Sequence, residues 1–355
     1  MKHLQGKKLI LALVLSTIFQ FWLSAQEKSD SLIIHTISTT LDIFEDPRPM
    51  EITLTLDLKT YQREKFEGEY IPVHFLYEFG DSVRIEKSMR IKARGKFRRE
   101  YCTFAPFWLN IRKANVTNEH LQDVKKMKVV TQCKGGKAYS EYVLKEYLAY
   151  KIYNMLSPVS FRVRLIHMTY IDTGRKNKVT ENWAFLIEPE EMLAERNGGI
   201  AIKKDELSMH FMRTEQMDVA ALFLYMIGNS DYSIVGRHNM KILGLPDYGS
   251  KGYTPVPYDF DYSGIVNSHY AVPGENLGIS SVRQRYYLGP CREDQEFQKA
   301  IDHIQSHRDE ILELVEDFPY LAPKHKKEMI RYLEAYFDSA SRPGFIRSGL
   351  QTSCR

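Results

Sequence analysis

Alternation of apolar and polar residues dominates the chain from residue 50 onward. The segment 50–58 alternates at a period of two, 71–79 is aromatic and β-branched, and 84–98 alternates again. A period of two is typical of strands, whose successive side chains point to opposite faces. Gly80 and Gly95 mark turns or bulges in this region. The pattern therefore predicts a β-rich N-terminal lobe.

The period changes to that of a helix near residue 139. Apolar side chains recur at helical spacing over 139–156, and Pro158 ends the run. The segments 161–172 and 182–188 predict two strands, and 190–196 predicts a short helix. We expect the two strands to form a hairpin between the lobes.

A buried helix is predicted after Thr214, which is a suitable N-cap. Its residues 219–227 are apolar on nearly all sides, and Gly228 is placed to end it. Further elements are predicted as short strands at 239–245 and 253–258 and as helices between 293 and 340. The fold class is therefore α+β, with a β-rich N-lobe over 26–138 and a hairpin plus a mainly helical C-lobe over 139–355.

The first 25 residues predict a secretory signal peptide. Three lysines precede an apolar run over 9–23, and the small pair Ser24-Ala25 suits cleavage. An uncleaved anchor helix is the alternative, but about 15 apolar residues fall short of the ~20 that span a bilayer. We expect a secreted or periplasmic protein with no stable membrane span after cleavage.

Composition and net charge indicate which kinds of binding partner the protein can be expected to have. With 43% hydrophobic and 26% charged residues the chain is typical of a globular protein, not a disordered one. The formal charge of +4 includes the three lysines of residues 1–25, and without them it falls to +1. This gives no case for nucleic-acid binding, so any anion site must be local.

The four cysteines favour disulfides over a metal site. They form no C-x-x-C pair and no Cys/His cluster with zinc-ligand spacing. In an exported protein we expect Cys102 to pair with Cys133, although four cysteines allow three full connectivities.

Candidate chemistry gathers after the apolar helix. Asp231 follows that helix, Asn239 comes eight residues later, and Asp259 and Asp261 follow a predicted strand. In an extended backbone Asp259 and Asp261 would point to one side and reach a single hard cation. Carboxylate and amide groups of this kind serve phosphoryl transfer. The alternative is that each is a turn-forming or chance acidic residue.

Two cationic features accompany these acids. Every second residue from Arg90 to Arg98 is basic, which predicts either a phosphate-binding strand face or a charged, protected sheet edge. Lys128 and Glu146 are placed like the strand lysine and helix glutamate that hold ATP phosphates in kinases. The alternative for Glu146 is a solvated helix face.

Taken in order, these segments resemble the spore coat protein CotH family of secreted, atypical kinase-like proteins. The resemblance covers roughly residues 85–265. The matching segments are Arg94-Gly95, the helix 142–156, Gly228-Asn-Ser-Asp231, His238-Asn239 and Tyr258-Asp259-Phe-Asp261.

The resemblance implies a two-lobed, protein-kinase-like fold that uses ATP with Mg²⁺ or Mn²⁺. It implies that Asp231 orients the acceptor hydroxyl, that Arg94 binds phosphates, and that Asn239, Asp259 and Asp261 hold the metal. We expect the acceptor to be a protein or a glycan, and the sequence does not identify it.

Two departures from the family pattern affect the nucleotide site. Tyr258 replaces the usual Trp, and Phe107-Trp-Leu-Asn110 replaces a strand that often carries lysine. The nucleotide lysine is therefore not identified by the match. A non-catalytic envelope protein that keeps the fold as a binding surface is the runner-up, and a manganese-dependent glycosyltransferase is a third class.

Overall fold

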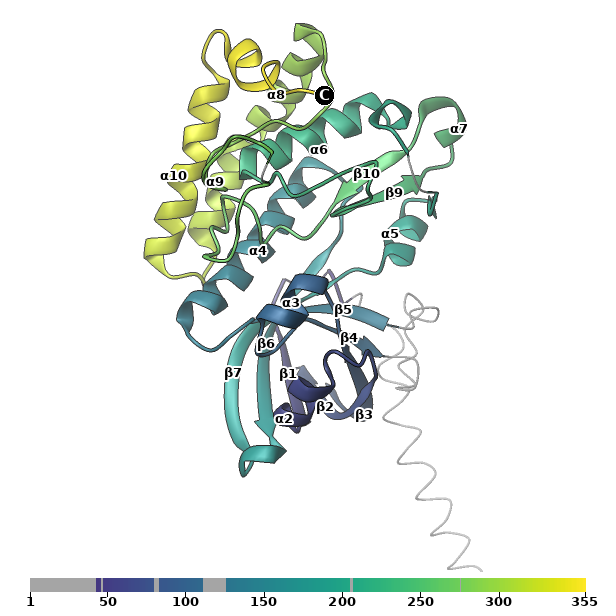
Figure 1. Cartoon of the computed structure of the whole chain (residues 1–355), viewed down its shortest axis with the longest axis vertical. Helices are drawn as coiled ribbons and strands as arrows, with labels where there is room; N and C mark the ends of the chain where they lie inside the picture. The colour runs from purple at the N-terminus through teal and green to yellow at the C-terminus, as the bar shows by residue number, and fades with distance from the viewer. Residues whose placement is uncertain (1–42, 46, 80–82, 111–125, 205–206, 275) are drawn as a thin grey trace, which may run out of the picture.

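The fold is mixed α+β, with a β-rich N-terminal part and a helical C-terminal part, as the pattern predicts (Figure 1). The computed structural model describes residues 43–45, 47–79, 83–110, 126–204, 207–274 and 276–355. The predicted signal peptide lies outside the described residues. In the described part of the chain, no helix combines the length and the apolar character needed to cross a membrane.

Seven strands close into a barrel in the order β1-β2-β3-β4-β5-β7-β6. All neighbours are antiparallel except β1 and β6, which pair in parallel. Alternate side chains of these strands fill the interior, as β1 illustrates with buried residues at every second position. The strands are β1 Met50–Leu56, β2 Ile71–Phe79, β3 Val83–Ala93, β4 Phe107–Asn110, β5 Lys126–Thr131, β6 Val163–Asp172 and β7 Lys178–Ile187.

The hairpin expected between the lobes belongs to the barrel instead. Its strands β6 and β7 pair with each other, and β6 also pairs with β1 while β7 pairs with β5. The edges of β1 and β5 would otherwise be unpaired, and closing the barrel satisfies their backbone groups. The boundary expected at residue 138 therefore separates strands of one barrel.

Helix α4, Lys137–Leu156, connects the barrel to the helical part (Figure 1). It contacts β6 and β7 on the barrel side and α6 and α9 on the other. Because it is covered on most sides, even Lys145 and Glu146 on this helix are buried. It ends at Ser157, just before Pro158, since a proline disfavours helical backbone in the residue before it.

The helical part packs around α6, Thr214–Ile227, whose side chains are mostly buried from Met217 onward. Thr214 begins this helix but does not cap it, because the N-cap is Arg213 and makes no side-chain cap bond. Gly228 ends α6 in the left-handed conformation, as predicted. The surrounding helices are α5 Glu190–Arg196, α7 Tyr248–Lys251, α8 Asp294–Ser306, α9 Arg308–Asp317, α10 Pro323–Ala340 and η4 Ile346–Leu350.

Small elements complete the chain. A sheet in the order β10-β9-β8 lies beside α5 and α6 in the helical part (Figure 1). Its strands are β8 Ile200–Ala201, β9 Met240–Gly244 and β10 Thr254–Pro257, and the remaining short helices are α2 Leu58–Glu64, α3 Lys96–Tyr101, η2 Thr173–Arg175 and η3 Met209–Phe211.

Two disulfides tie the chain. Cys102 bonds to Cys133, which confirms the expected pair, and Cys291 bonds to Cys354. The first joins the end of α3 to the residues after β5, within the β-rich part. The second holds the C-terminal segment against the residues before α8.

The cationic strand predicted over residues 90–98 is wrong in its second half. Strand β3 ends at Ala93, and α3 begins at Lys96 after Gly95, which has a φ of 82°. A residue with an ordinary side chain rarely adopts this backbone conformation, so Gly95 allows the change of direction. Arg90 and Lys92 lie on the strand, whereas Lys96 and Arg98 lie on the helix.

Candidate functional site

The loop after α6 places Asp231 and Asn239 side by side. Asn229 Oδ1 accepts a hydrogen bond from the Asp231 backbone N–H at 2.8 Å. The Asn239 side-chain amide donates to Asp231 twice, to the carbonyl oxygen at 2.8 Å and to Oδ2 at 3.1 Å. His238 Nε2 lies 2.9 Å from the other carboxylate oxygen. The Asp231 carboxylate is thus oriented while its side chain stays 40% exposed.

Asp259 and Asp261 follow β10 but do not lie on an extended strand, so that expectation is wrong. Asp259 has a φ of 65°, and its backbone N–H donates to the hydroxyl of Tyr150 on α4 at 2.8 Å. The Asp261 carbonyl accepts a hydrogen bond from Ser268 Oγ at 2.8 Å. A fixed turn, not strand geometry, brings the two carboxylates toward one cation.

That cation is Arg98, which α3 contributes from the β-rich part. Its Nε and Nη2 lie 2.9 and 2.7 Å from the same oxygen of Asp261. Its Nη2 also lies 2.9 Å from Glu146 Oε2 and 3.7 Å from Asp259 Oδ1. The side chains of Arg98, Glu146 and Asp261 are 12%, 2% and 7% exposed. One guanidinium therefore contacts three carboxylates, of which those of Glu146 and Asp261 are nearly buried and that of Asp259 is 33% exposed.

Burial and charge crowding shift the ionisation of this cluster. Burial raises the pKa of Glu146 to about 8 and that of Asp261 to about 6, against the opposing effect of Arg98. Burial also opposes the charge on Arg98, but the carboxylates of Asp261 and Glu146 outweigh it and hold the guanidinium pKa well above its usual value. The arginine stays charged, and the carboxylates compete for it.

A cavity of about 470 Å³ gathers the predicted acidic residues and several cations. Asp231, Asn239, Asp259 and Asp261 all line it, although 30 residues separate the first from the last. The chain therefore brings together the four side chains that we singled out near the apolar helix. The remaining lining residues are Arg94, Gly95, Lys96, Phe97, Arg98, Glu100, Pro106, His238 and Tyr262.

Lys128 does not pair with Glu146, so the expected lysine–glutamate pair is wrong. Glu146 bonds to Arg98 instead. The Lys128 ammonium lies near three aromatic rings, at 4.6 Å from the centroid of Tyr258, 5.7 Å from Trp108 and 5.8 Å from Phe161. Burial, with Arg94 and Lys241 nearby, lowers its pKa to about 7.

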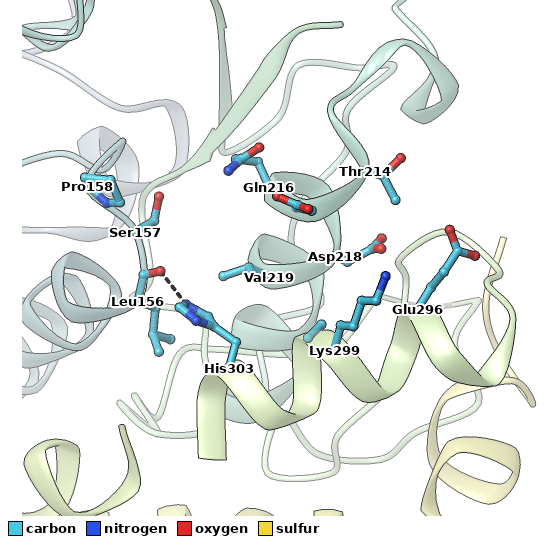
Figure 2. A pocket seen from close by; sticks show the side chains of 12 residues that line it. Leu156, Ser157, Pro158, Thr214, Gln216, Asp218, Val219, Glu296, Lys299 and His303 are labelled. Atoms are coloured by element: carbon cyan, nitrogen blue, oxygen red, sulfur yellow. Dashed lines mark hydrogen bonds between the residues drawn. The ribbon is translucent and has the colours of Figure 1, made fainter. Parts of the chain in front are cut away.

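A second cavity, of about 500 Å³, lies between the end of α4, the start of α6 and α8 (Figure 2). Two of its polar groups, His303 and Asp218, are already engaged. His303 Nε2 donates to the Leu156 carbonyl at 2.8 Å, and the Asp218 carboxylate accepts from Arg292 at 2.9 and 3.0 Å. None of the site residues predicted from the sequence lines this cavity. We therefore place the candidate site in the charged cavity beside α3.

Arg98 is the residue whose role the sequence did not reveal. Arg98 is the last of five basic residues at every second position, a pattern that predicts one strand face on which all five cations share the same environment. The nearby signals for a change of direction were Gly95 and the expected disulfide at Cys102, which bracket α3. Neither identifies Glu146 and Asp261 as partners, because these lie 48 and 163 residues away.

Comparisons with known proteins add little to this geometry. No family model matches the sequence, and a search of the curated proteins gives no match. Among solved structures, the crystal structure of a Helicobacter pylori proinflammatory kinase, CtkA, is similar at 13% sequence identity and a TM-score of 0.37. The match covers 70% of this chain and 90% of that one. Similarity at this level assigns neither a fold nor an activity.

Proposed function

We propose that the chain is an exported, kinase-like phosphotransferase that moves the terminal phosphoryl group of ATP to a hydroxyl group of a protein or glycan. The observation that carries this proposal is the charged cavity beside α3, which Asp231, Asn239, Asp259 and Asp261 line together. Phosphoryl transfer needs cations for the phosphates and a carboxylate that orients the attacking hydroxyl. This cavity offers both kinds of group.

In the proposed reaction, Asp231 accepts the proton of the acceptor hydroxyl. Its carboxylate is held by Asn239 and His238 and remains exposed enough to meet a substrate. The acceptor oxygen forms a bond to the γ-phosphorus, the bond from that phosphorus to the bridging oxygen breaks, and ADP leaves. Arg94 and Lys96 line the same cavity, and among the described residues neither pairs with a carboxylate. They are the cations available to phosphate oxygens.

The donor chemistry of Asn239, Asp259 and Asp261 suits a hard cation such as Mg²⁺. In the arrangement described, however, the guanidinium of Arg98 lies against both carboxylates. An ion and a guanidinium cannot share this place, so the site as it stands does not fit the metal. We therefore assign no step of the reaction to a metal ion.

A second candidate function is a non-catalytic binding protein with the same fold. The buried contacts of Arg98 favour it, because they engage the carboxylates that would otherwise hold a metal. The mostly antiparallel barrel disfavours the glycosyltransferase alternative, which calls for a parallel nucleotide-binding sheet.

The Asp231→Asn variant tests the proposal. We expect ADP formation from ATP to fall at least a hundredfold, because the amide cannot accept the proton, while ATP affinity stays within threefold of wild type. ADP formation is measured by coupled assay and affinity by calorimetry. Asp309→Asn, at an acid whose side chain is 92% exposed on α9, is the matched control.

Three outcomes separate the candidates. Loss of turnover in Asp231→Asn alone supports the phosphotransferase. ATP binding by the wild type without ADP formation supports the binding protein. A wild-type protein that does not bind ATP contradicts the phosphotransferase and favours the non-catalytic alternative.

A further inference from the structure

Helix α3 carries a cation into an acidic triad formed by other elements. Glu146 comes from α4, and Asp259 and Asp261 come from the turn after β10. One carboxylate oxygen of each lies within 4.8 Å of the others. Oxygens that share one divalent ion at ~2.0–2.6 Å are separated by no more than roughly 5 Å. The triad thus has the dimensions of a cation-binding site, and Arg98 lies within it.

Arg98 leaves one carboxylate oxygen of the triad without a hydrogen-bond partner. Glu146 is 1% exposed, and its Oε1 is buried without a hydrogen-bond partner among the described residues. A buried oxygen without a partner is destabilising. One positive charge also faces three acidic groups. The site therefore retains capacity for a cation of higher charge that can contact more oxygens.

Helix α3 is held mainly by a few specific contacts. None of its six residues is fully buried, and Gly95 before it makes no side-chain cap. The Cys102–Cys133 disulfide fixes its C-terminal end, and its Phe97 and Tyr101 side chains contact the aromatic rings of Tyr262 and Tyr270. Because these links hold the helix without Arg98, the guanidinium can leave the triad while α3 stays in place.

We infer that Arg98 is the built-in cation of the Glu146–Asp259–Asp261 triad, and that a divalent cation such as Mn²⁺ binds there only when the guanidinium leaves. In the state described, α3 closes the cation site. This inference concerns the pocket of the proposed function, but it is tested without nucleotide, so the two can fail separately.

The test compares Mn²⁺ binding by the wild type and by Arg98→Gln, measured by electron paramagnetic resonance with no nucleotide present. Glutamine removes the charge but keeps a polar side chain of similar reach. We expect Arg98→Gln to bind one Mn²⁺ at least tenfold more tightly than the wild type, and Asp261→Asn in that background to abolish the gain.

Lys96→Gln is the matched control, because Lys96 lies on the same helix and lines the same cavity. It loses the same charge without touching the triad, so its Mn²⁺ affinity should change less than threefold. If Arg98→Gln does not fold, Arg98→Lys replaces it. A lysine cannot bridge the carboxylates bidentately, so we expect at least threefold tighter Mn²⁺ binding than in the wild type.

Two results would overturn the inference. One is a wild-type protein that binds Mn²⁺ as tightly as Arg98→Gln and loses that binding in Asp261→Asn, because the triad would then accept the ion with Arg98 in place. The other is a folded Arg98 variant with no gain over the wild type or over Lys96→Gln.

Discussion

At the scale of single residues, two largely buried cations in this protein, Arg98 and Lys128, have opposite environments. Arg98 lies among carboxylates, and its charge is stabilised. Lys128 lies among aromatic rings, and its charge is disfavoured by burial. Cation–π contacts contribute roughly 0.5–2 kcal/mol each, which is less than the desolvation of an unpaired ammonium. Burial disfavours the charge of both cations, and only the carboxylate partners of Arg98 outweigh that cost.

The low pKa of Lys128 predicts a pH-dependent effect of removing it. The folded-state pKa is about 7, whereas a lysine in the unfolded chain titrates near ~10.4. Between these values the unfolded chain binds more protons, so the lysine makes the free energy of unfolding rise with pH across that window. Below pH 7 the lysine is charged in both states, and its burial is fully unfavourable.

We therefore expect Lys128→Met to raise the melting temperature, and to raise it more at pH 6 than at pH 10. Calorimetric melts at the two pH values measure this difference. Lys324→Met, at an exposed lysine on α10, should show no such dependence. An equal gain at both pH values would mean that charge burial is not the cause.

At the scale of elements, α3 is the segment that the rest of the structure must hold in place. It is six residues long, too short to be stable alone, and its N-terminal side is a glycine. The disulfide from Cys102 to Cys133 fixes its other end to the chain after β5. In addition, the Phe104 backbone N–H donates to the Cys133 carbonyl at 3.1 Å. The helix is positioned by this covalent link, by polar contacts and by the contacts of Phe97 and Tyr101 with other aromatic rings.

Replacing both Cys102 and Cys133 with alanine should lower the free energy of unfolding by about 3–4 kcal/mol. The bridge spans 31 residues, and the chain-entropy relation gives this value for a loop of that length. Denaturant titration under non-reducing conditions measures the loss.

The same titration with reductant is the control, because it opens the bridge in the wild type as well. The difference between wild type and variant should then disappear. A difference that persists under reduction would point to lost packing of the cysteine side chains, not to the bridge.

At the scale of the whole molecule, the site depends on how the C-terminal helices meet the loop after α6. Gly228 ends α6 with a φ of 69°, and its carbonyl accepts from the Gly264 backbone N–H at 3.0 Å. A side-chain carbon at this glycine would overlap the Tyr332 hydroxyl on α10 and lie 2.9 Å from the Val282 carbonyl. The Asp231 loop, Gly264, Val282 and α10 therefore meet at this glycine.

We expect Gly228→Ala to destabilise the protein by more than 1 kcal/mol, because both the backbone conformation and the space around it exclude a methyl group. ATP affinity should also fall, since the strain displaces the Asp231 loop. Thermal melts and calorimetry measure the two effects. Gly135→Ala is the control, because a side-chain carbon there would meet nothing within 4 Å. Equal stability of the two variants would show that the residues around Gly228 move to make room for the methyl group.

The sequence by itself determined the features that depend on a few neighbouring residues. The short helix Glu190–Arg196 has the predicted bounds. Gly228 ends the buried helix as predicted, because glycine readily adopts the left-handed backbone conformation found there. The Cys102–Cys133 pair also followed from composition and compartment. Helical period, caps and turns are local properties, so a local pattern is enough to predict them.

Only the tertiary structure decided the features that depend on distant partners. The hairpin β6–β7 closes the barrel because the backbone groups at the edges of β1 and β5 need hydrogen-bond partners. A local sequence pattern does not indicate which strands will have unpaired edges. Arg98 meets Asp261 across 163 residues, and the left-handed turn at Asp259 directs a second carboxylate toward it. A charged residue has the same sequence signal on a solvated face as in a buried cluster. Which partner neutralises it depends on how separate elements pack.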